Sequence, residues 1–212
     1  MSARKPLLKI VLVGEAAVGK STLMHVYVRG HQPPADIAPT VGADFLSKEV
    51  VIGDRAASLQ LWDTAGAEKF RSVTTAFYRG SDGLLLVFDL TNAATFAAIR
   101  EHWAPHVRSA LALDSLGRTG RGPLFALVGN KSDAADRRAV SRADADALAA
   151  QLQVPYFETS ALQPDSVGKA VDAVLRIVDE EREQIYNVTM LSDFSGRRRV
   201  ASNDNKNACG SC

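Results

Sequence analysis

The segment from Gly14 to Ser21 carries glycine, lysine and serine at the spacing G-x-x-x-x-G-K-S. It follows the apolar run 7–13, which predicts a strand, and precedes a pattern typical of a helix. In such a turn the backbone N–H groups surround a phosphate, Lys20 reaches the β- and γ-phosphates, and the Ser21 hydroxyl is a ligand for Mg²⁺. The segment is therefore a predicted phosphate-binding loop, with an ordinary glycine-rich turn as the alternative. The expected nucleotide contacts are Gly14, Ala17, Val18, Gly19, Lys20, Ser21 and Thr22.

A second polar segment, Asn130-Lys131-Ser132-Asp133, follows the apolar run 124–129. It should lie just beyond the carboxyl end of a strand, where open α/β sheets bind their ligands. The Asp133 carboxylate can accept hydrogen bonds from the N1–H and N2–H₂ groups of guanine, which adenine does not offer. With the phosphate loop upstream, the segment favours a guanine nucleotide. A helix cap is the alternative reading of these four residues taken alone.

Asp63 follows the apolar run 57–62 and is the third element of the predicted site. A carboxylate at a strand end can hold Mg²⁺, and the Gly66 N–H can approach a γ-phosphate oxygen because glycine has no side chain. Thr40, upstream in a loop rich in proline and small residues, is a candidate second hydroxyl ligand for the metal. An ordinary turn threonine is its alternative role. The predicted metal ligands are thus Ser21, Thr40 and Asp63.

The order of apolar runs and helical patterns predicts the fold class. Apolar runs alternate with helix-like periodicity, which indicates an α/β protein with a mostly parallel sheet and helices on both faces. Gly53-Asp54 between two runs predicts a hairpin, so one edge strand should be antiparallel. The expected strands are six, at 7–13, 45–52, 57–62, 84–90, 124–129 and 154–157, and the expected helices are near 20–28, 68–79, 93–111, 141–151 and 165–184.

Length and composition predict one globular domain with a tail. The 212 residues are 46% hydrophobic, enough to form a core without metal or disulfide support. We expect this domain at 1–186 and a flexible tail at 187–212, where Ser, Asn, Asp, Gly and Arg dominate. The net charge of +1 gives no indication of a nucleic-acid partner. No apolar stretch approaches the ~18 residues that span a bilayer, so membrane contact should be peripheral or through lipid.

These motifs together resemble the Ras superfamily of small GTPases. Four further stretches are similar to those that mark its Rab branch, the vesicle-trafficking proteins: 41–45, 60–66, 77–80 and 86–91. Residues 43–50 and 155–161 are similar to the late-endosomal and lysosomal Rab subgroup. The resemblance runs from about residue 7 to residue 182 and implies a P-loop GTPase fold, a monomeric domain, and GTP or GDP with Mg²⁺ as cofactors.

The resemblance also implies a trafficking switch and its partners. Ser160-Ala161-Leu162 resembles the turn that contacts the base, with Leu162 in place of the usual lysine. Phe45, Trp62 and Phe77 match the aromatic trio that meets effectors, although a core role is the alternative for each. Other implied partners are an exchange factor, a GTPase-activating protein, and a GDP-dissociation inhibitor or prenylation escort protein. The implied location is the cytoplasmic face of late-endosomal or lysosomal membranes, with cycling through the cytosol.

Two departures from the family pattern concern the nucleotide. Ala67 stands where related GTPases carry the glutamine that orients the attacking water, so we expect slow intrinsic hydrolysis. Lys20, Thr40 and Gly66 remain as the predicted catalytic groups. An activating protein that supplies the missing group is one alternative, and a GTP-dependent binding module without hydrolysis is another. Gln32, with two prolines after it, occupies the region where the family places an aromatic over the base, which predicts faster nucleotide release.

Two cysteines end the sequence. Cys209 and Cys212 resemble the paired cysteines that Rab proteins geranylgeranylate, although the C-x-x-C spacing is not the commoner one. Two covalent lipid groups anchor a protein stably to a membrane, whereas one gives only marginal binding. The arginines at 197–199 can add attraction to anionic lipid. A redox or metal-binding C-x-x-C is the alternative. A kinase built on the same phosphate loop is a further alternative for the whole chain.

Overall fold

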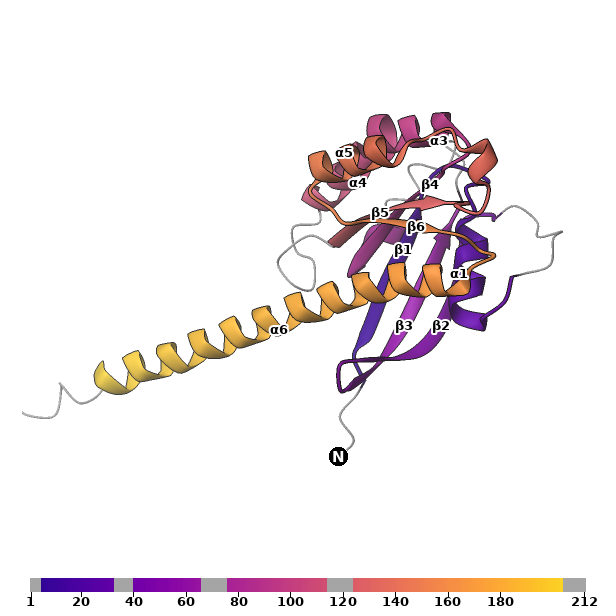
Figure 1. The fold of residues 1–212 in the computed structure, drawn as a ribbon. Coiled ribbons are helices and arrows are strands. Elements are labelled where there is room, and N and C mark those ends of the chain that lie inside the picture. The colour runs from indigo at the N-terminus through magenta and orange to yellow at the C-terminus, as the bar shows by residue number, and fades with distance from the viewer. Residues whose placement is uncertain (1–4, 33–39, 66–75, 114–123, 204–212) are drawn as a thin grey trace, which may run out of the picture. The chain divides into compact units, whose positions relative to one another are not determined.

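The structure, a computed structural model, describes residues 5–32, 40–65, 76–113 and 124–203. Six strands in these segments form one sheet in the order β2-β3-β1-β4-β5-β6 (Figure 1). Only the β2–β3 pair is antiparallel within the described sheet. The predicted α/β class with one antiparallel edge strand is confirmed. The strands are β1 (Leu7–Val13), β2 (Ala43–Ile52), β3 (Arg55–Thr64), β4 (Gly83–Asp89), β5 (Leu124–Asn130) and β6 (Tyr156–Thr159).

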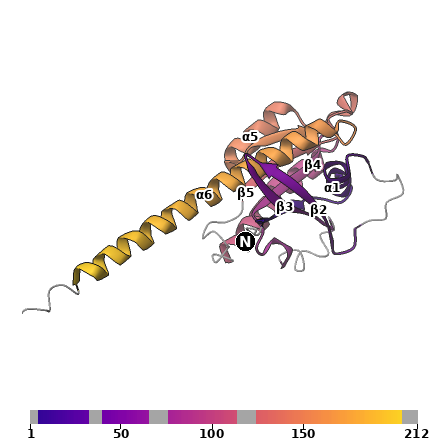
Figure 2. The same cartoon turned by 90° about the horizontal axis from the view of Figure 1, so that it is seen from below.

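Helices cover both faces of this sheet, as the alternating pattern predicted (Figures 1 and 2). Apolar side chains of α1 and of the first part of α6 pack on one face, and those of α4 and α5 pack on the other. Burial of these side chains removes apolar surface from water and is the main stabilising term of the fold. The helices are α1 (Lys20–Arg29), α3 (Ala93–Ala98), the π-helical turn η2 (Ile99–Trp103), α4 (Ala104–Leu113), the 3₁₀ turn η3 (Ala135–Arg137), α5 (Arg142–Leu152) and α6 (Pro164–Asn203).

The helix expected near 68–79 falls largely outside the described residues. Apart from small shifts in strand bounds, three other predicted elements differ from the observed ones. The strand expected at 154–157 is β6, two residues later, because Gln153 is left-handed and Pro155 has no N–H for the sheet. The helix expected at 93–111 contains the π-turn η2, which adds a residue to one turn of the helix. The helix expected at 165–184 begins at Pro164 and continues to Asn203.

The chain divides into two compact units, residues 1–178 and 179–212. The first contains the sheet and its covering helices, and the second contains the continuation of α6. None of the helices in the described part of the chain combines the length and apolar character needed to cross a membrane.

The parallel strands bring three predicted site segments to one edge of the sheet. β1, β4 and β5 are neighbours and run in the same direction, so the residues after them meet at their carboxyl ends. Gly14 follows β1, while Asp89 and Asn130 are paired across the ends of β4 and β5. The adjacent β3 brings Asp63 to the same edge, next to β1.

Candidate functional site

The phosphate loop is shaped by two glycines. A Cβ on Gly14 would lie 2.1 Å from the Val87 carbonyl oxygen, and one on Gly19 would lie 2.4 Å from Asn130 Nδ2. Both glycines also have positive φ angles, +150° and +96°, which a side chain would strain. The loop therefore packs tightly on β4 and on residues 130–133, the predicted base-recognition segment, only because these two positions lack side chains.

Lys20, the first residue of α1, closes the loop from inside. Its Nζ donates to the carbonyl oxygens of Gly14 at 2.9 Å and Glu15 at 2.8 Å, and the residue is 5% exposed. Burial lowers the pKa of Lys20 to about 8, although the carboxylates of Asp63 and Glu15 oppose this shift. An anionic phosphate in the loop would supply a counter-charge that favours the protonated ammonium.

The three predicted metal ligands converge. Asp63 Oδ2 accepts from Ser21 Oγ at 2.5 Å and from Thr40 Oγ1 at 2.8 Å, and the two hydroxyl oxygens are 3.1 Å apart. Asp63 is 1% exposed, and its Oδ1 is buried without a hydrogen-bond partner among the described residues. Oxygen ligands of this kind suit Mg²⁺, and an unpaired buried carboxylate oxygen is costly without a cation. The residues present therefore fit the metal that the sequence predicted.

Asp63→Asn is expected to weaken the magnesium dependence of nucleotide retention. The amide preserves the shape of the side chain but removes the charge that attracts a divalent cation. In the native chain, removal of Mg²⁺ with EDTA should accelerate GDP release at least tenfold, and in Asp63→Asn by about twofold or less. The release of a fluorescent GDP measures both rates. An equal EDTA effect in the two proteins would contradict this assignment of Asp63.

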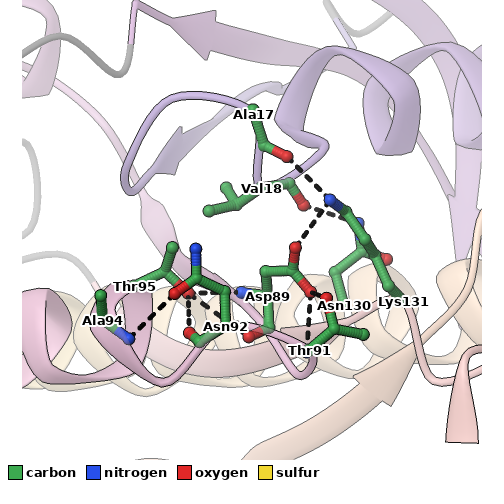
Figure 3. A network of polar contacts seen from close by, with 9 residues as sticks. All are labelled: Ala17, Val18, Asp89, Thr91, Asn92, Ala94, Thr95, Asn130 and Lys131. Atoms are coloured by element: carbon green, nitrogen blue, oxygen red, sulfur yellow. Dashed lines mark hydrogen bonds and ion pairs between the residues drawn. The ribbon is translucent and has the colours of Figure 1, made fainter. Parts of the chain in front are cut away.

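The base-recognition segment contacts the phosphate loop directly (Figure 3). Asn130 Nδ2 donates to the Val18 carbonyl at 2.8 Å, and Lys131 Nζ donates to the Ala17 carbonyl at 3.0 Å. Asn130 is 2% exposed, and its Oδ1 accepts from Thr159 Oγ1 at 3.2 Å. The two predicted halves of the site, for the base and for the phosphates, are thus joined through side-chain-to-backbone hydrogen bonds.

The second base-contacting turn, residues 160–162, orients Asp133. Ser160 Oγ donates to Asp133 Oδ1 and accepts from the Leu162 N–H at 3.0 Å. Gln32 Nε2 donates to the Ala161 carbonyl at 3.1 Å, so the glutamine in the region of the missing aromatic lies beside this turn. Leu162 is 66% exposed. The predicted residues of the base site therefore lie together, with the exposed Asp133 carboxylate held from one side by Ser160.

Some predicted site residues fall elsewhere. Thr22 lies half-buried in the first turn of α1, adjacent to Ser21. Gly66 and Ala67 lie outside the described residues, as do Cys209 and Cys212. The neighbouring Ala65 donates its N–H to the Gly42 carbonyl at 2.9 Å, which ties the end of β3 to the segment after Thr40.

The predicted effector residues form a row of rings. The Phe45 and Trp62 rings stack with centroids 4.8 Å apart and an interplanar angle of 19°. Phe77 lies 6.3 Å from Trp62, tilted by 34°. Phe45 is 44% exposed, whereas Trp62 and Phe77 are half-buried. The rings are therefore accessible in part, and a purely internal role does not describe Phe45.

Two contacts at the site were not anticipated from the sequence. Asp89, at the end of β4, pairs with Lys131 Nζ at 2.7 Å. Trp103, in the π-turn η2, donates its Nε1–H to Glu15 Oε1 of the phosphate loop at 2.9 Å. The place of Asp89 at the end of a buried run was a usable signal, because neighbouring parallel strands end at the ligand site. No local pattern indicates where Trp103 points.

The fold and the arrangement of these motifs define the class of P-loop GTPases. The sequence matches the profile of the Ras family over residues 9–180. It is 36% identical over 208 residues to the Ypt/Rab-type GTPase ypt7 of Schizosaccharomyces pombe, with 97% of each chain covered. It is 34% identical over 212 residues to the Ypt/Rab-type GTPase Rab7 of Gibberella zeae, with 98% of each chain covered. It is 38% identical over 197 residues to the human Ras-related protein Rab-27B, with 88% of this chain and 86% of the relative covered.

The chain belongs to the Ras family and, within it, is a Rab GTPase of the Ypt7/Rab7 type. The predicted resemblance to the Rab branch, and to its late-endosomal subgroup, is confirmed. The protein is therefore a small GTPase of vesicle trafficking. Ras-superfamily GTPases in general bind GTP and GDP with Mg²⁺.

Proposed function

We propose that this chain is a molecular switch that binds GDP and GTP with Mg²⁺ and controls traffic to the late endosome and lysosome. The observation that carries the proposal is the pair of hydrogen bonds from Asn130 and Lys131 to the Val18 and Ala17 carbonyls. They hold a guanine-selective segment beside a phosphate loop, which is the arrangement that one nucleotide would bridge. The vesicle compartment is proposed from the Ypt7 and Rab7 relatives.

The assigned roles follow the geometry of the site. The amides of the loop and Lys20 bind the phosphates, while Asp133 and the Ala161 N–H read the guanine. Ser21, Thr40 and Asp63 would hold Mg²⁺, which when bound neutralises phosphate charge. Thr40 and the segment that begins at Gly66 would change conformation when the γ-phosphate is lost.

The proposed site lacks one group that GTP hydrolysis ordinarily uses, the glutamine that orients the attacking water. Ala67 has no group that can orient a water molecule, so we propose slow intrinsic cleavage of GTP. A GTP-dependent binding module without significant hydrolysis is the second candidate, and the same residue favours it. Measurement of single-turnover cleavage with and without a Rab-directed activating protein separates the two. Family membership favours either candidate over the kinase alternative.

The surface and the tail complete the proposal. Phe45, Trp62 and Phe77 would receive effector proteins through their partly exposed rings. Cys209 and Cys212 would carry geranylgeranyl groups that anchor the chain to the cytoplasmic face of endomembranes. An exchange factor, an activating protein and a GDP-dissociation inhibitor or escort protein would govern the cycle. The switch domain would span 1–186, and 187–212, which is helical as far as Asn203, would act as its tether.

Calorimetry with Mg²⁺ tests the proposal on the native chain and two variants. GDP and GTP should bind at least 100-fold more tightly than ADP and ATP, because an unpaired acceptor penalises adenine. Asp133→Ala should lose most of this preference, since the variant lacks the carboxylate that reads guanine. Asp136→Ala, which removes an exposed carboxylate in η3, is the matched control and should bind like the native chain.

The proposal fails if neither GDP nor GTP binds, or if the adenine nucleotides bind as tightly. An unchanged preference in Asp133→Ala would overturn the role of that residue alone. Mass measurement of the protein isolated from cells tests the tail separately, because each geranylgeranyl group adds a fixed mass to its cysteine.

A further inference from the structure

We propose that Asp89 is a positioning residue that acts through Lys131 to hold the phosphate loop and so sets how long a nucleotide stays bound. The inference rests on the proposed function, because it concerns retention of a guanine nucleotide. Among the described residues, Asp89 makes no hydrogen bond to the phosphate loop itself, and its side chain reaches the predicted base segment only at Lys131. Its connection to the loop is the lysine ammonium (Figure 3).

The position of the Asp89 carboxylate is fixed before any ligand binds. Its Oδ1 accepts from the Thr91 N–H at 2.8 Å and from Thr91 Oγ1 at 2.7 Å. The Asp89 N–H donates to Thr95 Oγ1 at 3.0 Å, and the side chain is 9% exposed. A carboxylate held this way loses little entropy when it pairs with a cation, so the pair is stronger than an exposed one.

Lys131 is bound at both ends of this connection. Its Nζ lies 2.7 Å from Asp89 Oδ2 and 3.0 Å from the Ala17 carbonyl oxygen. Lys131 and Ala17 both have positive φ, +67° and +62°, a region that residues with a Cβ seldom adopt. Such backbone conformations persist only where surrounding contacts hold them. The Asp89–Lys131–Ala17 series supplies one such contact to each strained residue.

The electrostatics of Asp89 agree with a fixed ion pair. Burial acts to raise its pKa, but the Lys131 ammonium and the hydrogen bonds from Thr91 together lower it below its ordinary value. The carboxylate is therefore charged at neutral pH. Its charge keeps the half-exposed lysine directed at the loop carbonyl instead of at solvent.

Without the charge at Asp89, the ammonium of Lys131 loses one of its two protein acceptors. The Ala17 carbonyl then keeps a donor that is free to turn toward water, and the loop amides that face the phosphates become less ordered. Nucleotide release should accelerate, because pre-organisation of the loop slows dissociation.

A double-mutant cycle tests this route. Asp89→Asn should raise the release rate of fluorescent GDP about tenfold in the native background. In a Lys131→Met background, which is itself faster, Asp89→Asn should change the rate by less than about twofold. Thr91→Val, which removes one donor to Asp89 and no charge, should give a smaller acceleration of about two- to threefold. Asp146→Asn, which removes the exposed partner of Arg142 on α5, is the matched control and should leave release unchanged.

A spectroscopic readout separates positioning from general stability. In ¹H–¹⁵N spectra of the GDP complex, Asp89→Asn should shift the Ala17 and Val18 amide signals and leave that of Phe157 in β6 in place. Thermal unfolding without nucleotide reports any loss of fold, and Thr91→Val provides the test if Asp89→Asn does not fold.

Each outcome is informative. Native GDP binding with unchanged release in both Asp89→Asn and Thr91→Val would overturn this inference and leave the proposed function intact. Equal acceleration by Asp89→Asn in both backgrounds would also overturn it, because Asp89 would then act by a route other than Lys131. Failure of the native chain to bind GDP would overturn the proposed function, and with it the role of Asp89.

Discussion

Ala67→Gln is expected to raise the single-turnover rate of GTP cleavage by about 100-fold or more. A glutamine amide can accept from and donate to an attacking water and a phosphate oxygen, whereas a methyl group can do neither. Loss of one preorganised group of this kind costs roughly 3–4 kcal/mol of transition-state stabilisation. The rate is measured by mixing the GTP-loaded protein with Mg²⁺ and following the release of phosphate.

Ala67→Leu is the matched control for that experiment. Leucine is similar in size to glutamine but has no hydrogen-bonding atoms in its side chain, so this variant should cleave GTP no faster than the native chain. If Ala67→Gln and the native chain have equal rates, the missing glutamine does not limit hydrolysis. If an activating protein accelerates the native chain to the rate of Ala67→Gln, that protein supplies the absent group.

Lys20→Ala is expected to weaken GDP binding by about 100- to 10,000-fold. The ammonium should form two charge-assisted hydrogen bonds to phosphate oxygens, each worth about 1.5–3 kcal/mol. Nucleotide-free protein should keep its thermal stability, because the substitution also relieves the burial of a cation that is 5% exposed. Calorimetry and thermal unfolding of the same samples measure the two effects.

Lys48→Ala provides the comparison for Lys20→Ala. Lys48 Nζ also donates to a backbone carbonyl, that of Tyr27, at 2.8 Å, but it lies on β2 away from the phosphate loop. Its removal should leave GDP affinity within about twofold of native. Similar losses in the two variants would mean that Lys20 acts through the fold and not through the phosphates.

The sequence was most predictive where a motif or pattern acts locally. The run 7–13 became β1 with its bounds unchanged, and Gly53 takes the positive φ of the predicted hairpin turn, +59°. Both depend on interactions between residues near each other in the chain. β6 began two residues late because a left-handed Gln153 and the proline after Val154 delay the first sheet residue.

The parts that escaped prediction depend on contacts between distant segments. The Asp89–Lys131 pair joins the ends of β4 and β5, and the sequence alone does not show that these two strands are adjacent in the sheet. The contact of Trp103 with Glu15 depends on the π-turn, because the extra residue changes the direction of the side chains that follow it. A helical periodicity has no signal for one added residue, so the run 93–111 read as a single regular helix.

The antiparallel register of β2 and β3 has a mechanical consequence. Phe45 is paired with Trp62, and the next pair along the two strands is Asp44 with Asp63. The stacked rings of Phe45 and Trp62 are therefore one residue along their strands from the Asp63 pair, whose carboxylate accepts from Thr40. A Mg²⁺ ion bound at Asp63 would therefore lie one residue pair away from the surface that a docked protein would contact.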